Sequence, residues 1–135
     1  MTFVHQTDTR MKRPIFPPNA ARPLAPYTPG ILAGDLLFLS GQIALDAEGV
    51  LHTDDISTET HKVMENLGNL LRAAGMDHGN LVKVTIFLSD MAHYAAVNEV
   101  YGTYFKEDPP AREAIAVKGL PRGVNVEISG IACRG

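Results

Sequence analysis

Apolar residues between positions 56 and 74 follow a helical period, which is the clearest pattern along the chain. Seven of them recur at helical spacing and would share one face of a helix: Ile56, Val63, Met64, Leu67, Leu70, Leu71 and Ala74. Asp54 or Asp55 can cap the beginning of this helix, and Gly75 can end it. The pattern therefore predicts one long amphipathic helix.

Shorter patterns predict a second helix and several strands. The second helix is expected over residues 91–105, because Pro109–Pro110 forbids its continuation. Short apolar runs bounded by turn residues predict strands over residues 36–39, 43–45, 82–88, 112–117 and 124–132, and the run at 82–88 is rich in β-branched residues. The order strands, helix, strand, helix, strands indicates an α+β fold, with one mixed sheet and two helices packed on one of its faces.

The N-terminal part of the chain has a different character. Prolines at positions 14, 17, 18, 23, 26 and 29 exclude a helix, so residues 14–30 are expected to be extended or looped. Residues 1–12 are polar and lack periodicity, which predicts a flexible tail. Residues 13–135 are expected to form a single domain, because a 135-residue chain with 45% hydrophobic residues can bury about two-thirds of its unfolded surface.

The composition argues against several kinds of binding partner. The formal net charge is -3, which argues against a nucleic-acid partner. Cys133 is the one cysteine, so no disulfide can form within the chain. No apolar run approaches the roughly 20 residues that span a bilayer. We therefore expect a cytoplasmic protein with no membrane partner.

The sequence contains no pattern typical of metal or covalent chemistry. The five histidines lie at positions 5, 52, 61, 78 and 93, and no two have the i, i+3 or i+4 spacing of helical metal sites. No glycine-rich phosphate loop, GxSxG motif or Cys–His arrangement stands out. We expect neither a metal nor a cofactor.

Two charged residues lie within the apolar closing strands. Arg112 follows Pro109–Pro110, and a guanidinium presented so rigidly suits capture of a small carboxylate, although a surface cation is the plainer interpretation. Strand alternation places Glu127 on the face opposite Val126, together with Asn125 and Ser129. A solvent-facing carboxylate on an edge strand is the plainer interpretation of Glu127.

Three other positions have both a structural and a functional interpretation. Ser40–Gly41 is either an ordinary strand-to-turn transition or a substrate contact through its hydroxyl and backbone. Tyr27 is either a hydrophobic plug in its loop or a ligand contact. Asn98 lies on the apolar face of the second helix, where it either ties the helix to a loop or contacts a ligand.

Taken together, six segments match the Rid (reactive intermediate deaminase) family, also called YjgF or L-PSP, in order and spacing. The match covers about residues 14–132, and its segments are residues 25–28, 39–43, 65–67, 97–101, 110–112 and 120–128. The resemblance implies a chorismate-mutase-like α+β fold. It also implies a homotrimer with active sites in the clefts between neighbouring subunits.

The resemblance assigns roles to individual residues. Arg112 corresponds to the arginine that clamps the substrate carboxylate, and Glu127 is our hypothesis for the base that activates water. Tyr27, Ser40 with Gly41, and Asn98 correspond to positions around the ligand. The implied reaction is hydrolysis of 2-imino or 2-enamino acids, such as 2-iminopropanoate and 2-iminobutanoate, to 2-keto acids and ammonia.

The chain departs from the family pattern at two glutamates, and other functions stay open. Glu113 follows Arg112 where serine is usual, and it either weakens the positive field or points away; Glu59 replaces a common glutamine. The substrate is alternatively 3-aminoacrylate or an aminomuconate-type enamine. A non-catalytic small-ligand-binding or chaperone-like trimer is a further alternative, and a ribonuclease is the least favoured because the acidic balance would repel RNA.

Overall fold

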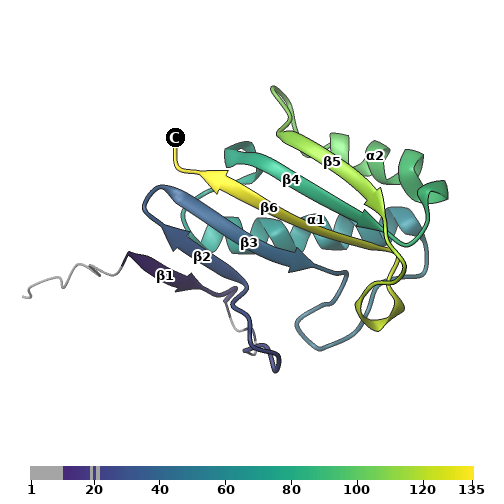
Figure 1. Ribbon diagram of the computed structural model, residues 1–135, viewed down its shortest axis with the longest axis horizontal. Helices are drawn as coiled ribbons and strands as arrows, with labels where there is room; N and C mark the ends of the chain where they lie inside the picture. Colours follow the sequence, from purple (N-terminus) through teal and green to yellow (C-terminus); the bar gives the residue numbers. More distant parts are fainter. Residues whose placement is uncertain (1–10, 19, 21) are drawn as a thin grey trace, which may run out of the picture.

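The computed structural model describes residues 11–18, 20 and 22–135 and has one six-stranded sheet with two helices on one face (Figure 1). The strands are β1 (Lys12–Ile15), β2 (Gly30–Ala33), β3 (Leu36–Gln42), β4 (Leu81–Leu88), β5 (Ala111–Ala116) and β6 (Val126–Cys133). Their order in the sheet is β1-β2-β3-β6-β4-β5. Only β4 and β5 pair in parallel, so the sheet is mixed as the sequence predicted.

The long helix forms where its apolar period and its caps predict it. Helix α1 (Ile56–Ala73) begins after Asp55, whose carboxylate accepts a hydrogen bond from the Thr58 backbone N–H at 2.8 Å. It ends before Gly75, which has a φ of 75°, a conformation that glycine adopts without strain. The buried face of α1 packs against β3 and β6 and contributes much of the core.

The second helix is shorter than predicted. A 3-10 turn, η2 (Met91–His93), precedes helix α2 (Tyr94–Gly102), which ends three residues before the expected boundary at Phe105. Asp90 caps η2 by accepting a hydrogen bond from the Ala92 N–H. Two further 3-10 turns, η1 (His78–Asn80) and η3 (Pro121–Gly123), lead into β4 and toward β6.

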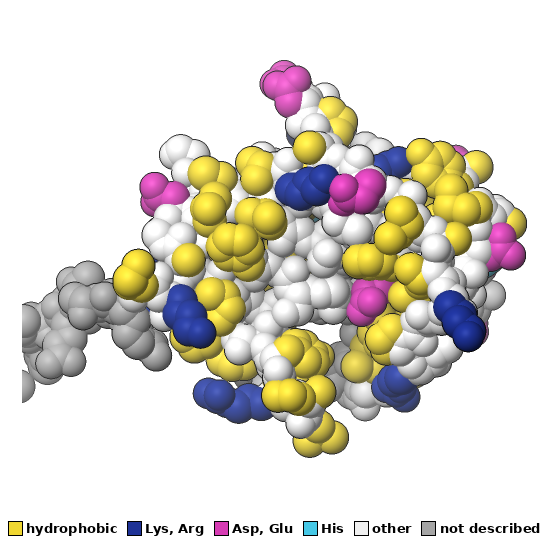
Figure 2. All heavy atoms as spheres, in the orientation of Figure 1, with side chains coloured by type: hydrophobic (Ala, Val, Ile, Leu, Met, Phe, Trp, Pro, Cys, Tyr) yellow, Lys and Arg dark blue, Asp and Glu magenta, His cyan; other side chains and the backbone are white. Residues whose placement is uncertain are grey.

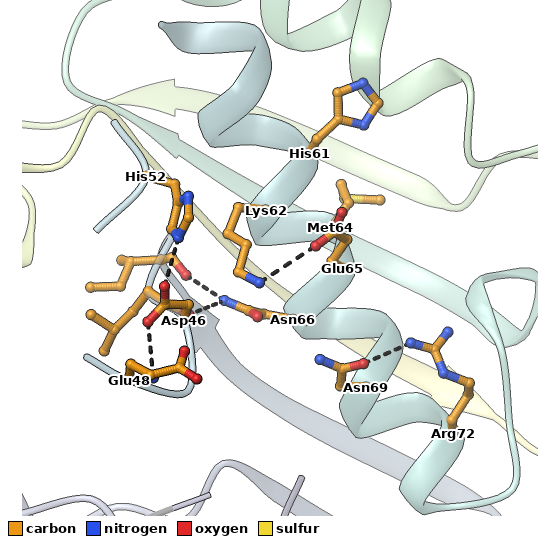
Figure 3. A network of polar contacts seen from close by, with 12 residues as sticks. Asp46, Glu48, His52, His61, Lys62, Met64, Glu65, Asn66, Asn69 and Arg72 are labelled. Carbon is orange, nitrogen blue, oxygen red and sulfur yellow. Dashed lines mark hydrogen bonds and ion pairs between the residues drawn. The ribbon is translucent and has the colours of Figure 1, made fainter. Parts of the chain in front are cut away.

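The expected strand over residues 43–45 is wrong. The chain leaves the sheet after Gln42, and Leu45 makes only an isolated bridge with Leu51. The carbonyl groups of Ile43 and Leu45 accept hydrogen bonds from the Asn66 side chain of α1 at 2.9 and 2.8 Å (Figure 3). A side chain from α1 thus satisfies backbone groups that a strand neighbour would otherwise satisfy.

The N-terminal segment contains two strands that the sequence did not predict as strands. In β1, Pro14 lies opposite Ile31 of β2, and an edge strand tolerates proline because its outer N–H groups need no partner. Lys12, which belonged to the expected tail, pairs with Ala33. The rest of that tail, residues 1–10, lies outside the described residues.

The two faces of the sheet differ. The helix face carries both helices, and its strand residues, such as Val84, Ile86 and Ile128, are fully buried. The other face, which we call the open face, carries no helix and points toward the viewer in Figure 2, where apolar side chains gather over the strands. Exposed members of this face include Leu36, Phe38 and Ile115, and Phe38 retains 42% of its accessible surface.

Neither helix within the described part of the chain combines the length and the apolar character needed to cross a membrane.

Candidate active site

Arg112 lies on β5 and points to the helix face, where helix α2 holds its guanidinium. It is in register with buried Val84, which fixes its side of the sheet. Nη1 donates a hydrogen bond to Asn98 Oδ1 at 2.8 Å, and Nη2 donates one to the Tyr94 hydroxyl at 3.1 Å. Two of its five N–H donors are thereby used, and the other three have no partner among the described residues.

Aromatic rings surround the same guanidinium. Its central carbon lies 5.0 Å from the ring centre of Tyr101 and 5.7 Å from that of Tyr94, distances at which a cation is attracted to the ring face. Burial raises the pKa of Tyr101 to about 12, against the opposing effect of the Arg112 charge. The Tyr101 hydroxyl is buried and has no hydrogen-bond partner among the described residues.

The residues on α2 that contact Arg112 follow from helical geometry. Tyr94, Asn98 and Tyr101 are spaced i, i+4 and i+7, so they line one side of the helix. Sequence reasoning identified Asn98 as a candidate but missed the two tyrosines as partners of Arg112. Their helical spacing from Asn98 was the signal in the sequence that could have identified them.

Glu127 lies on the open face, as strand alternation predicted. It is in register with Phe87, whereas its neighbours Val126 and Ile128 are fully buried on the helix face. Partial burial raises the pKa of Glu127 above its ordinary value. A carboxylate in this environment holds a proton more readily than a fully solvated one, which suits a group that moves protons near neutral pH.

Gly41 and Ser40 lie beside Glu127, at an irregularity in β3. The register between β3 and β6 shifts between Leu39 and Gln42, and such bulges are frequent next to functional sites. A Cβ atom at Gly41 would lie 2.9 Å from the carboxyl carbon of Glu127, so a larger residue would displace the carboxylate from its present position. Ser40, Gly41 and Glu127 therefore form one cluster on the open side.

The Ser40 hydroxyl links this cluster to the proline-rich loop. Ser40 Oγ donates a hydrogen bond to the Thr28 carbonyl at 2.6 Å, and the Ser40 N–H donates one to the Pro29 carbonyl at 2.9 Å. Tyr27 precedes this anchor in the loop, and 54% of its surface is exposed. Ser40 thus ties the backbone of the Tyr27 loop to this cluster through its hydroxyl and its N–H.

The structure does not bring Arg112 and Glu127 together within one chain. They project from opposite faces of the sheet, and β4 lies between their strands. Two strand spacings separate β5 from β6, about 10 Å, and the side chains point in opposite directions. The candidate residues therefore form two half-sites, with Arg112 and Asn98 in one and Ser40, Gly41 and Glu127 in the other.

Glu113 points away from Arg112. Its carboxylate lies on the open face and accepts hydrogen bonds from Lys83 Nζ at 2.6 Å and from Thr85 Oγ1 at 2.5 Å. These two contacts hold the pKa of Glu113 below its ordinary value. Glu113 was expected either to weaken the positive field at Arg112 or to point away from it. It points away, because neighbouring residues of a strand face opposite sides of the sheet.

Glu59 supports the beginning of β6. It has no accessible surface, and its carboxylate accepts hydrogen bonds from Asn125 N at 2.7 Å, Asn125 Nδ2 at 2.8 Å and Val126 N at 3.1 Å. The expectation that Asn125 shares the open face with Glu127 is therefore wrong. Asn125 precedes the strand, and its side chain turns to α1 to pair the buried carboxylate.

Within the described ranges, no three His, Cys, Asp or Glu side chains cluster closely enough to hold a metal ion. A polar network does follow the outer side of α1, where Lys62 pairs with Glu65 at 3.5 Å and Arg72 donates to Asn69 at 2.7 Å (Figure 3). In the same view, His52 pairs with Asp46 at 2.8 Å. Asp46 also accepts hydrogen bonds from Glu48 N and Val50 N, so the network closes a turn.

Comparison with known proteins agrees with this arrangement of elements. A family model described as Endoribonuclease L-PSP matches residues 18–134. A RutC family protein of Pyrococcus horikoshii is 45% identical over 90% of this chain and 98% of its own length. The Mus musculus protein named 2-iminobutanoate/2-iminopropanoate deaminase is 41% identical over 87% of each chain. The crystal structure of E. coli TdcF with bound serine has a TM-score of 0.85 and 31% identity, over 91% of this chain and 99% of that one. The chain belongs to the Rid family, also called YjgF or L-PSP.

Proposed function

We propose that this protein hydrolyses small 2-imino acids, such as 2-iminopropanoate and 2-iminobutanoate, to 2-keto acids and ammonia. The observation that carries the proposal is the Arg112 half-site. Asn98 and Tyr94 fix its guanidinium, and its other three donors have no partner among the described residues. A guanidinium held in this way is suited to bidentate capture of a carboxylate. Imino acids derived from amino acids carry such a carboxylate next to the reactive carbon.

The Glu127 half-site supplies the proton chemistry. In the protonated imine, the carbon of the C=N bond is already electrophilic, so the reaction needs positioning and one proton carrier. Glu127 takes a proton from water as the oxygen adds to this carbon and then returns the proton to the nitrogen. The C–N bond then breaks and ammonia leaves, while Glu127 takes the second water proton from the hydroxyl group, so that the carbon becomes the carbonyl of the 2-keto acid. Glu127 passes this proton to the ammonia, which departs as ammonium. One water is consumed for each iminium, and no cofactor enters the balance.

A shared site explains how two half-sites on opposite faces act on one substrate. We infer a chorismate-mutase-like homotrimer in which Arg112 of one subunit meets Ser40, Gly41 and Glu127 of its neighbour. The open face supports this inference, because it carries the exposed apolar residues Leu36, Phe38 and Ile115 as well as Glu127. An isologous dimer or a ring would cover this surface, and the resemblance favours the ring of three.

The similar proteins support the substrate class. The Mus musculus relative is named for 2-iminobutanoate and 2-iminopropanoate, and E. coli TdcF was solved with serine, which carries the same α-carboxylate. The family model is described as an endoribonuclease, but ribonuclease activity fits this chain less well. The chain has a net charge of -3, which opposes binding to the phosphate backbone of RNA.

The decisive test generates the imino acid with an amino-acid oxidase or dehydratase and follows keto-acid formation with and without this protein. Wild type should accelerate hydrolysis, and Arg112→Ala should reduce kcat/KM by at least about a hundredfold, because a charge-assisted bidentate contact is lost. Glu65→Ala, on the exposed side of α1, is the matched surface control and should match wild type. No acceleration with several small imino acids would contradict the proposal, and 3-aminoacrylate and RNA would then be tried in turn.

A complementation experiment tests the shared site separately. Arg112→Ala and Glu127→Gln subunits are unfolded together and refolded as mixed assemblies. If each site takes Arg112 and Glu127 from different subunits, random mixing of equal amounts leaves about a quarter of the sites intact. Activity should therefore return in the mixture although each variant alone is inactive. A mixture as inactive as its components would contradict a site built from two chains.

A further inference from the structure

The hydroxyl of Tyr94 lies next to Arg112 but takes no part in the proton transfers proposed for Glu127. It is the first residue of α2, and its oxygen accepts a hydrogen bond from Arg112 Nη2 at 3.1 Å. When a phenol oxygen accepts a hydrogen bond, its own proton remains available for donation. The hydroxyl can therefore donate a hydrogen bond to a molecule next to the guanidinium.

Accessibility distinguishes Tyr94 from the other tyrosine at Arg112. Tyr94 keeps 38% of its surface exposed, whereas Tyr101 lies beneath the guanidinium with its hydroxyl buried. A molecule that binds the other N–H groups of Arg112 can reach the exposed Tyr94 hydroxyl, but it cannot reach the buried hydroxyl of Tyr101. Tyr101 contributes its ring to the site, and Tyr94 can contribute a hydrogen bond.

We propose that Tyr94 is a substrate-binding residue, which donates its hydroxyl proton to the carboxylate that Arg112 holds. This inference rests on the proposed function, because it names a further contact in the same site. The carboxylate has two oxygens with about four lone-pair sites, so it can accept from the guanidinium and from the phenol together. The donor chain from Arg112 through Tyr94 polarises the hydroxyl and strengthens that second contact.

Such a contact makes Tyr94 a determinant of specificity. An anionic carboxylate gains from both Arg112 and Tyr94, whereas a neutral amide of the same shape forms weaker hydrogen bonds with each. Tyr94 should therefore matter more for an acid than for its amide. A residue whose only role was to hold Arg112 in position would form no hydrogen bond with the ligand.

The test compares binding of 2-oxobutanoate and 2-oxobutanamide to full-length wild type, Tyr94→Phe and Tyr104→Phe by NMR titration. Tyr104→Phe is the matched control, because it removes the same atom from a hydroxyl that contacts His61 at 2.9 Å, away from Arg112. Tyr94→Phe should raise the Kd for 2-oxobutanoate about tenfold, the expected effect of one lost hydrogen bond to a charged group. The Kd for the amide should change by less than about threefold.

A spectroscopic signal separates direct contact from support. The chain has four tyrosines, so selective 13C labelling at Cζ gives few resonances, and the one that is absent in Tyr94→Phe belongs to Tyr94. This resonance should shift on addition of 2-oxobutanoate and saturate with the Kd of wild type. The resonance that is absent in Tyr104→Phe should stay in place.

Three results would overturn the inference. The first is unchanged binding of 2-oxobutanoate by Tyr94→Phe, and the second is equal weakening by Tyr94→Phe and Tyr104→Phe. The third is a Tyr94 resonance that does not respond to the ligand. If wild type hydrolyses imino acids and any of these results is found, the inference alone fails. If wild type neither binds 2-oxobutanoate nor hydrolyses imino acids, the proposed function fails as well.

Discussion

At the scale of single residues, burial determines what each polar group of the site can do. Partial burial on the open face raises the pKa of Glu127, whereas two hydrogen bonds lower the pKa of Glu113 on the same face. Strand alternation could predict the face of Glu127 but not that of Asn125, which turns to Glu59 before the strand begins. Periodicity places residues inside an element, and it fails at the ends, where local contacts decide.

The raised pKa of Glu127 predicts how activity depends on pH. The base is active only when ionised, so the wild-type rate should fall as the pH falls through the pKa of Glu127. That fall should occur at a higher pH than the ordinary glutamate value. Glu127→Gln should lower kcat by about a hundredfold or more, since it removes a general base, and it should remove this acidic limb. A variant that keeps the wild-type pH profile would exclude Glu127 as the base; circular dichroism would verify its fold.

Tyr101→Phe tests the cost of a buried hydroxyl. The Tyr101 oxygen has no hydrogen-bond partner among the described residues, so its removal should leave the free energy of unfolding unchanged or raise it by up to about 1 kcal/mol. The phenylalanine ring still stacks under Arg112, and catalysis should therefore be preserved. Urea denaturation measures the change. A loss of more than 1 kcal/mol would mean that the hydroxyl is satisfied in the assembled protein.

At the scale of elements, a single buried carboxylate connects α1 to β6. Glu59 lies in the first turn of α1 and accepts three hydrogen bonds from residues 125 and 126, at the start of the strand that carries Glu127. The sequence showed this glutamate as a departure from the family pattern. It could not show the role of the residue, because its three donors lie 66 and 67 positions away along the chain.

Glu59→Ala should therefore destabilise the fold strongly. It removes the buried acceptor of three N–H donors, one buried and two partly buried, which is expected to reduce the free energy of unfolding by about 3 kcal/mol or more. The control on the same helix is Glu65→Ala, whose exposed carboxylate pairs with Lys62 at 3.5 Å and should contribute less than about 1 kcal/mol. Equal effects of the two substitutions in chemical denaturation would show that the buried contacts contribute little.

At the scale of the whole molecule, the open face is the surface that most needs a partner. Apolar side chains gather on it (Figure 2). Its exposed apolar residues include Phe38 and Ile115, which share this face with Glu127. A soluble monomer seldom leaves the face of a sheet uncovered in this way. The proposed trimer would cover it and bring Glu127 toward the Arg112 of a neighbouring copy.

Phe38→Asp should dissociate the assembly without unfolding the subunit. Wild type is expected to sediment at about three times the chain mass of 14.6 kDa, and the variant near the mass of one chain, because a buried unpaired carboxylate is costly in an apolar interface. Deaminase activity should fall with the loss of the trimer. Val50→Asp, at an exposed apolar position in a loop, is the control and should keep both mass and activity. A Phe38→Asp variant that stays assembled and active would contradict the proposed interface.

The sequence by itself determined the two helices, most of the strands and the face of Glu127, because these depend on local periodicity, caps and prolines. The six matching segments also determined the family. Tertiary structure decided the rest: the pairing of β1 and β2, the loss of the strand over residues 43–45, the partners of Arg112 and the direction of Glu113. These features depend on contacts between residues that are distant along the chain, such as Asn66 with Ile43 or Arg112 with Tyr94. Local sequence patterns cannot predict such contacts, because the contacts form, and stabilise the protein, only when the elements pack together.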